Sequence, residues 1–201
     1  MLIAQKLRKE NIAEYLLYMW QVEDIIRAYG CNLQQIKKEY ISRFDCTDEQ
    51  KEEMVDWYGN LIRMINQEGC REKGHIQINK IVLQQLSELH AQLLDSPKFP
   101  FYSTEYYKVL PFIVELRQKN SNGEAAGEIE TCFNALYGTM LLRLQNKEIT
   151  QNTANAVKEI TTFIGMLNDY YFKEKEDPKF WDSKPLTRPL GHPLPKGRGR
   201  N

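Results

Sequence analysis

Residues 11–30 read NIAEYLLYMWQVEDIIRAYG, and this stretch decides the fold class. Its apolar residues recur at steps of three and four, which is the period of one face of an α-helix. Gly30 follows, and glycine ends helices at low cost because it adopts the left-handed conformation. The stretch therefore predicts a helix over residues 11–29, with an inward face made of Ile12, Leu16, Met19, Val22 and Ile26.

The same helix is apolar over more than one face, because Leu17, Trp20 and Ile25 lie outside that stripe. A helix that is apolar most of the way round is either central to a bundle or buried against a partner. Both interpretations stay open from the sequence.

Further helices follow on both sides of this one. Residues 2–8 and 32–41 predict short helices, and residues 47–50 (TDEQ) form a capping-box signature that opens a helix ending at Gly69. Residues 76–94 predict another helix, and Thr150 is placed to cap the last one. In the helix that begins at residues 47–50, the expected inward residues are Met54, Trp57, Leu61 and Ile65. In the helix over residues 76–94 they are Ile78, Val82, Leu86, Leu89 and Leu93. In the helix capped by Thr150 they are Val157, Ile160, Ile164, Leu167 and Tyr171.

Proline divides the second half of the chain. All eight prolines lie at or after Pro97. Residues 96–102 (SPKFPFY) predict a rigid aromatic loop, after which Ser103 or Thr104 caps a helix that reaches about residue 119. Pro111 lies inside that helix and removes one of its hydrogen bonds, so we expect a kink or a break at Leu110.

Residues 121–124 (SNGE) form a second capping-box signature. The helix expected after it has the inward residues Ile129, Phe133, Leu136, Met140 and Leu144. No segment shows the apolar alternation of a strand bounded by turn residues. The prediction is thus an all-α bundle of about five long helices and two or three short ones, formed by residues 1–176.

Residues 177–201 are rich in proline, glycine and basic residues, a composition that cannot bury enough surface to offset the entropy of ordering. We expect a disordered basic tail. From Pro178 onward the tail has six Lys or Arg against one Asp, whereas the whole chain has 27 basic and 27 acidic residues. The body is therefore mildly acidic, and we expect nucleic-acid binding at most weakly, through the tail.

The four cysteines form no Cys-x-x-Cys pair, and in a chain of 201 residues they indicate free thiols in a reducing compartment. No apolar run approaches the roughly 18–20 residues of a membrane span, and the first residues are too polar for a signal peptide. We therefore expect a cytoplasmic protein that does not enter a membrane.

Two segments resemble a known family. Residues 1–7 (MLIAQKL) with 11–24 (NIAEYLLYMWQVED), and residues 107–117 (YKVLPFIVELR), are similar to all-helical bacterial proteins of about this length, a domain of unknown function. The resemblance extends over residues 1–172 and leaves out the tail. It implies the same fold class and a bacterial cytoplasmic setting, and it implies no activity or site residues.

Motifs that carry chemistry are sparse. A di-metal bundle needs two Glu-x-x-His pairs, and the chain has one, Glu72 with His75, in a segment bounded by glycines. The phosphate-binding glycine motifs do not occur, so we expect no metal and no cofactor. His90 borders an apolar stripe and is interpreted as a structural histidine with satisfied hydrogen bonds. Cys70, beside Arg71, is the best placed candidate for a nucleophile, although an incidental thiol is the favoured interpretation.

Two groups of residues are candidates for a ligand pocket. The first lies on the helix over residues 11–29, and the second combines the aromatic loop with the helix that follows it. Aromatic residues with polar tips are enriched in pockets and interfaces, and Arg117 could pair with an anion. The candidate ligand-binding residues are Tyr18, Trp20, Glu23, Asp24, Arg27, Tyr106 and Arg117.

Three hypotheses for function remain open. The favoured one is a non-enzymatic helical protein-interaction domain that forms a homodimer, because the helices have wide apolar faces and no chemical constellation. The second is an enzyme or small-ligand binder with its pocket near the first long helix and the aromatic loop. The third is a nucleic-acid accessory protein that acts through its basic tail.

Overall fold

The computed structural model describes residues 2–119 and 126–182, and in these ranges it contains eight α-helices and no strand. The all-α prediction is confirmed. Six of the described helices have 17 or more residues, where about five long ones were expected. The helices are α1 (Leu2–Glu10), α2 (Ile12–Ala28), α3 (Leu33–Gln35), α4 (Asp48–Gln67), α5 (Gln77–Asp95), α6 (Pro100–Lys119), α7 (Glu128–Leu144) and α8 (Gln151–Glu176).

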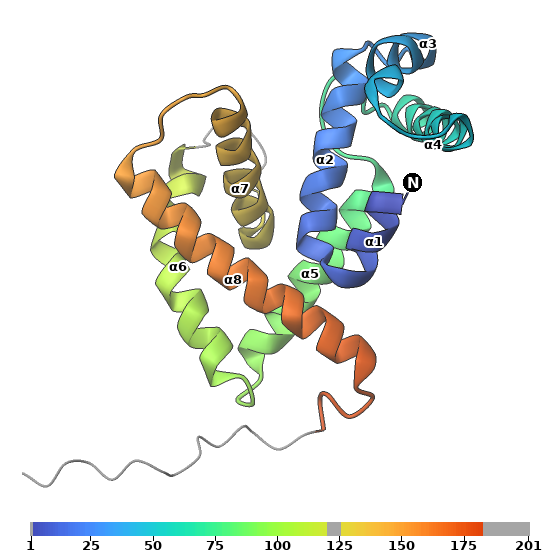
Figure 1. Ribbon diagram of the computed structural model, residues 1–201. Coiled ribbons are helices and arrows are strands. Elements are labelled where there is room, and N and C mark those ends of the chain that lie inside the picture. Colours follow the sequence, from blue (N-terminus) through green and yellow to red (C-terminus); the bar gives the residue numbers. More distant parts are fainter. Residues whose placement is uncertain (1, 120–125, 183–201) are drawn as a thin grey trace, which may run out of the picture.

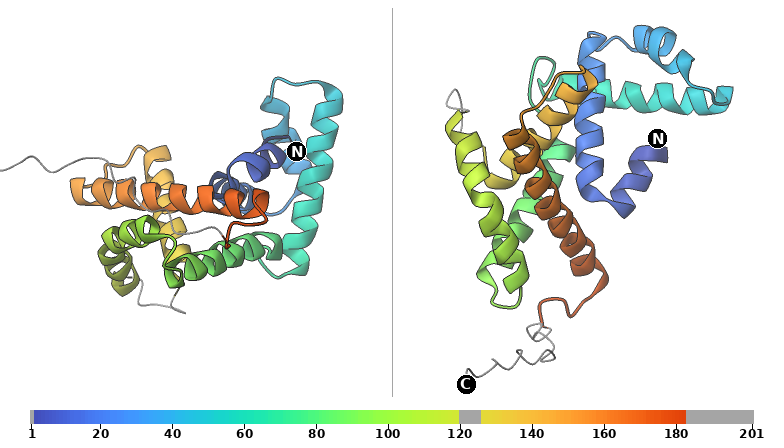
Figure 2. Two further views of the ribbon diagram at one scale, coloured as in Figure 1. Left: turned by 90° about the horizontal axis from the view of Figure 1, so that it is seen from below. Right: turned by 60° about the vertical axis from the view of Figure 1, so that its left-hand side comes forward.

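Helices α2, α5 and α8 pack against one another at the centre of the molecule (Figure 1). Helix α1 folds back along α2, and α6 and α7 pack on the other side of α8. Helices α3 and α4 extend from the end of α2 as an arm. This arm lies apart from α6 and α7 (Figure 2). None of the helices in the described part of the chain is both long and apolar enough to cross a membrane.

Helix α2 has the boundaries and the inward face that its sequence predicts. The Asn11 side chain accepts a hydrogen bond from the Glu14 N–H at 3.0 Å and caps the start. At the end, Gly30 adopts a φ of +61°, and the N–H of Cys31 bonds to the Ile26 carbonyl at 2.9 Å. Trp20 and Glu23 are buried as well as the predicted apolar stripe. Burial on more than one face fits the central position of α2.

The arm combines a confirmed helix with an irregular segment. Thr47 and Gln50 form the predicted capping box at the start of α4. Tyr58 is buried on α4, whereas Trp57, expected inward, is only half-buried. In place of the single short helix expected over residues 32–41, α3 continues into a π-helical turn, Ile36–Tyr40, and a 3₁₀ turn, Ile41–Arg43.

The predicted start of α6 is wrong, and so is the break that was one of two alternatives at Leu110. The aromatic loop is shorter than expected, because Pro100 begins the helix and Ser103 lies within it. Proline suits the first helical position, where its missing N–H has no intrahelical partner and its φ is already helical. The helix then continues through Pro111 to Lys119, so the chain does not break at Leu110.

Helices α7 and α8 complete the bundle. Helix α7 begins at Glu128 after Gly127, and the capping signature at 121–124 lies outside the described residues. Ile129 and Phe133 are buried as predicted, but Leu144 is 63% exposed, so its inward assignment is wrong. Helix α8 starts at its predicted cap, Thr150, and all five of its predicted inward residues are buried.

Residues 177–182 fold back onto the end of the bundle. Phe180 is buried and stacks on Phe99 with ring centroids 5.1 Å apart, and Trp181 lies edge-on to the same ring. The packed part of the chain therefore includes the first residues after α8. The rest of the predicted tail, residues 183–201, lies outside the described residues.

Candidate functional site

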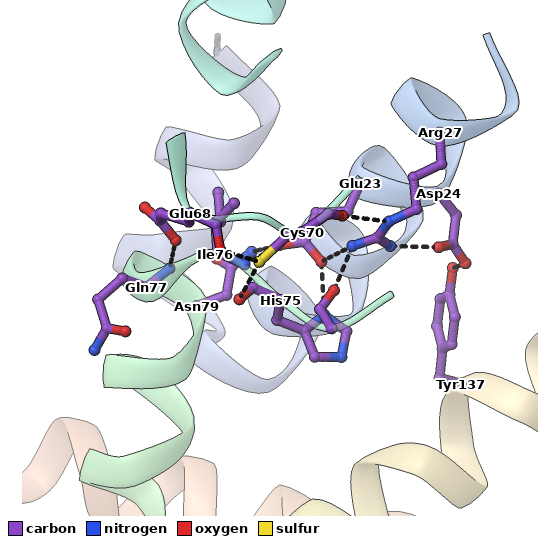
Figure 3. Close-up of polar contacts among 11 residues, drawn as sticks. Glu23, Asp24, Arg27, Glu68, Cys70, His75, Ile76, Gln77, Asn79 and Tyr137 are labelled. Carbon is purple, nitrogen blue, oxygen red and sulfur yellow. Dashed lines mark hydrogen bonds and ion pairs between the residues drawn. The ribbon is translucent and has the colours of Figure 1, made fainter. Parts of the chain in front are cut away.

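A buried carboxylate is the centre of the candidate site. Glu23 lies on α2 with none of its surface exposed. Its Oε1 atom accepts hydrogen bonds from the Ile76 N–H at 3.0 Å and from Asn79 Nδ2 at 2.8 Å. Its Oε2 atom lies 2.6 Å from Nδ1 of His75. A buried charge is tolerated only when it is paired and hydrogen-bonded, and Glu23 meets that condition (Figure 3).

Arg27, one turn further along α2, binds the loop that joins α4 to α5. Its Nε atom donates to the Cys70 carbonyl at 3.1 Å, and its Nη2 atom donates to the Gly74 carbonyl. Its Nη1 atom pairs with Asp24 Oδ1 at 2.8 Å, and its Nη2 atom lies 3.9 Å from Glu23 Oε2. Arg27 thus links two carboxylates on α2 to two carbonyls of the loop.

Tyr137 extends this network to α7. Its hydroxyl donates to Asp24 Oδ2 at 2.6 Å. Burial, and then the neighbouring carboxylate of Asp24, raise the pKa of Tyr137, so its hydroxyl stays protonated as a donor. The polar contacts therefore join α2, the α4–α5 loop, α5 and α7 (Figure 3).

The His75 ring is held on two sides. It stacks on the Trp20 indole with centroids 4.1 Å apart and planes 12° apart. Because the Glu23 carboxylate can only accept, Nδ1 of His75 carries the proton in this contact. Its second ring nitrogen points away from Glu23 in Figure 3, and 26% of the side chain is exposed. A histidine oriented by a carboxylate in this way is chemically able to transfer a proton.

The Cys70 thiol and the side-chain oxygen of Asn79 help to distinguish a structural role of this site from a ligand-binding one. The Cys70 thiol is buried and donates to the His75 and Glu68 carbonyls at 3.4 and 3.5 Å, so it acts as a donor that holds the loop. By contrast, the Asn79 side-chain oxygen is buried and accepts no hydrogen bond among the described residues. The contacts of Glu23 and Arg27 described above are with other groups of the protein, and they fix the α4–α5 loop.

A second buried polar cluster, the His90 cluster, lies between α5, α6 and α7. Nδ1 of His90 lies 2.7 Å from the Tyr102 hydroxyl, and Nε2 lies 3.3 Å from Glu128. Tyr106 donates to the same Glu128 oxygen at 3.0 Å. A neutral His90 satisfies both contacts by donating from Nε2 and accepting at Nδ1.

Burial dominates the protonation of the His90 cluster. It lowers the pKa of His90, against the opposite influence of Glu128. Burial and the hydrogen bond to Glu128 raise the pKa of Tyr106 to about 12, and burial followed by Glu128 raises the pKa of the Cys132 thiol to about 12. The imidazole, the phenol and the thiol are therefore all neutral near pH 7.

The structure divides the predicted ligand-binding residues. Trp20, Glu23, Asp24 and Arg27 lie together, as expected of neighbours on α2. Tyr18 lies apart from them, near Tyr40, where burial raises its pKa to about 12.

The other two predicted residues lie on α6. Tyr106 belongs to the His90 cluster, and Arg117 is exposed near the end of the helix. His75, Asn79 and Tyr137 carry no sequence signal as partners of this group, since they lie 52 to 113 residues from the α2 residues they contact.

Metal sites and clefts elsewhere in the described residues are the other places where a ligand could bind. No group of three or more His, Cys, Asp or Glu side chains in the described part of the chain could hold a metal ion. A cleft of about 550 Å³ lies between α6, α7 and the start of α8, and none of the seven predicted ligand-binding residues lines it. Its lining combines apolar side chains, among them Phe112, Leu116, Val157 and Ile160, with polar ones.

The fold and its two buried polar clusters define the chain as an all-helical domain. The chain belongs to the family described as Domain of unknown function (DUF4924), which matches residues 1–178. The resemblance seen over residues 1–172 is thereby confirmed at the level of the family. Comparison with curated proteins and with solved structures gave no match.

Proposed function

We propose that the chain is a helical protein-interaction domain that forms a homodimer through the outward face of α6. The observation that carries this proposal is the apolar surface of that helix. Tyr107 is 66% exposed and Val114 is 46% exposed, and Pro111 is exposed between them. The opposite face of α6 supplies Tyr102, Tyr106, Val109 and Ile113 to the core.

The spacing of these residues makes one continuous face. Positions 107, 111 and 114 follow the i, i+4, i+7 pattern of one side of a helix. Lys108 and Glu115 lie along one edge of that side, and both side chains are more than half exposed. Their present partners, Glu105 and Lys119, lie on the same helix. The Glu115–Lys119 pair is exposed on both sides, and such pairs contribute little to stability, so Glu115 can exchange its partner at low cost. The partner of Lys108, Glu105, is only 20% exposed.

This face is complementary to itself. In an antiparallel pair of α6 helices with the two-fold axis near Pro111, Lys108 of one copy lies beside Glu115 of the other. Tyr107 then lies beside Val114 of the second copy along the opposite edge. Each contact occurs twice, as a two-fold interface requires. A contact of one helix pair belongs to the small class of interfaces, below about 1,200 Å², so we expect association that depends on concentration.

Sedimentation velocity of the full chain over a concentration series tests this proposal. We expect a monomer–dimer equilibrium in wild type, weakened about tenfold or more by Val114→Asp, because a charge would be buried opposite Tyr107. Ile81→Asp is the matched control, since Ile81 is 43% exposed but lies on α5. Lys108→Glu should also weaken the dimer, and Lys108→Glu/Glu115→Lys should restore it. A monomer at every concentration, or equal effects of Val114→Asp and Ile81→Asp, contradicts the proposal.

A second candidate function, small-ligand binding beside α2, is supported by the orientation of His75. Glu23 and Trp20 fix its ring, while its second nitrogen points away from them. Native mass spectrometry of protein purified gently from cell extract tests this candidate. A bound species of metabolite mass that is lost in His75→Phe supports it, and a bare chain in all preparations argues against it.

A further inference from the structure

A small apolar pocket lies at the corner between α1 and the start of α4. Its volume is about 200 Å³, and its walls include Ile3, Phe44, Cys46 and Met54. Ile3 is 49% exposed, although it is a large apolar side chain. Pockets for whole small-molecule ligands are larger, about 300–1,000 Å³. The size of this corner pocket therefore fits single side chains of a peptide.

The rim of the corner pocket is acidic. Asp45 and Glu53 line it, and both are exposed. They belong to residues 45–56, which contain six acidic residues and one lysine, Lys51. The four other acidic residues of this segment are Asp48, Glu49, Glu52 and Asp56, all exposed. A peptide that binds here should combine a small apolar group with positive charge, since complementary charges favour encounter and register.

The C-terminal tail of this same chain has that composition in a repeated form. Residues 185–188, 189–192 and 193–196 read PLTR, PLGH and PLPK, so the pattern Pro-Leu-x-basic occurs three times in succession. Residues 183–201 contain five Lys or Arg and no acidic residue. Proline reduces the freedom of an unbound peptide, which lowers the entropic cost of binding it. The repeat offers three leucines, which are followed two residues later by Arg188, His192 and Lys196.

We propose that the corner pocket binds the Pro-Leu-x-basic repeat of a second copy of this chain. A leucine of the repeat enters between Ile3, Phe44 and Met54, and the basic residue that follows pairs with Asp45 or Glu53. The corner lies beside the start of α1, whereas the described chain ends beyond α8 at the other end of the molecule (Figures 1 and 2). The tail of another copy approaches the corner without passing around the bundle. This contact is separate from the α6 face and does not depend on it.

Fluorescence anisotropy of a labelled peptide of residues 183–201, titrated with the full-length protein, tests the proposal. Burying a leucine removes its apolar surface from water, so a peptide with all three leucines replaced by serine should bind at least tenfold more weakly. A scrambled peptide of the same composition, in which no leucine has a basic residue two positions later, should lose affinity as well, because the pocket and its acidic rim then cannot be occupied together. Equal binding of the native and scrambled peptides would overturn the proposal.

Protein variants locate the binding site. Glu53→Lys and Ile3→Ser should each weaken binding of the native peptide several-fold, and Glu72→Lys, at an exposed position in the α4–α5 loop, should leave it unchanged. Val114→Asp should also leave peptide binding unchanged, so failure of the α6 dimer and failure of the pocket are distinguishable. If the peptide binds a single-stranded oligonucleotide but not the protein, or if the Glu53 and Ile3 variants bind like wild type, the proposal is wrong.

Discussion

Glu23→Ala removes the acceptor on which a buried part of the α4–α5 loop and α5 depends. The Ile76 N–H and the Asn79 side-chain amide both donate to Oε1 of Glu23, and both residues are almost fully buried. Each donor left without a partner costs about 1–3 kcal/mol. His75 and Arg27 retain access to water, so they add less. The expected loss of unfolding free energy is therefore about 3–5 kcal/mol, the range seen when one partner of a buried pair is removed.

Glu23→Gln separates the charge of this side chain from its shape. The amide oxygen can still accept from Ile76 and Asn79, while the amide nitrogen faces Nδ1 of His75. That exchange requires the other tautomer of the histidine and replaces a charged hydrogen bond by a neutral one. Charged hydrogen bonds contribute about 1.5–3 kcal/mol and neutral ones about 0.5–1.5 kcal/mol. We therefore expect Glu23→Gln to lose about 1–2 kcal/mol, clearly less than Glu23→Ala.

Urea unfolding followed by circular dichroism and tryptophan fluorescence measures both losses by linear extrapolation. Glu14→Ala is the control on the same helix, because Glu14 is exposed and such substitutions usually change stability by less than about 0.5 kcal/mol. If Glu23→Ala is no less stable than Glu14→Ala, the carboxylate does not hold the loop. An increase in stability would indicate instead that Glu23 is kept for a function that costs stability.

Three further outcomes follow from other parts of the molecule. Burial lowers the pKa of His90 in the folded state below its value of about 6.5 in the unfolded chain. The free energy of unfolding should therefore fall as the pH drops below that value. Urea unfolding from pH 7.5 to 5 should show a smaller loss of this free energy in His90→Gln than in wild type. Iodoacetamide followed by peptide mass spectrometry should modify the half-buried Cys46 well before Cys132, whose buried thiol has a pKa of about 12; equal rates would contradict the packing at Cys132. Thr47→Ala should lose about 1 kcal/mol of unfolding free energy through the capping box of α4, and Thr47→Ser should lose less.

The sequence was informative at helix ends that a single local cap determines. Asn11 and Gly30 bound α2, and Thr150 begins α8, because caps act on backbone groups within one turn. The start of α6 was predicted wrongly for a related reason. Ser103, Thr104 and Pro100 are all signals of a helix start, and the choice among them depends on whether Phe99 and Tyr102 can be buried together against α8. Residue spacing does not contain that information.

The candidate site could be predicted only on its α2 side. Glu23, Asp24 and Arg27 are neighbours on one helix, so their proximity follows from helical geometry. Their partners in the loop, on α5 and on α7 have no motif, since a backbone carbonyl or an asparagine amide carries no pattern of its own. His75 was noted only as a member of an incomplete metal motif. Its role in the structure depends on the stack with Trp20, which only the packing of the loop on α2 creates.

The His90 cluster connects the buried core to the proposed dimer face. Tyr102 and Tyr106 lie on α6, and their hydroxyls reach His90 and Glu128, so these contacts fix how α6 is rotated about its axis. Successive residues of a helix point about 100° apart. When Tyr106 is held inward, its neighbour Tyr107 must therefore point outward, where it is 66% exposed. An exposed tyrosine held in one orientation loses less freedom on binding than a mobile one. The buried polar residues of the His90 cluster thus orient the surface through which we propose that two copies meet.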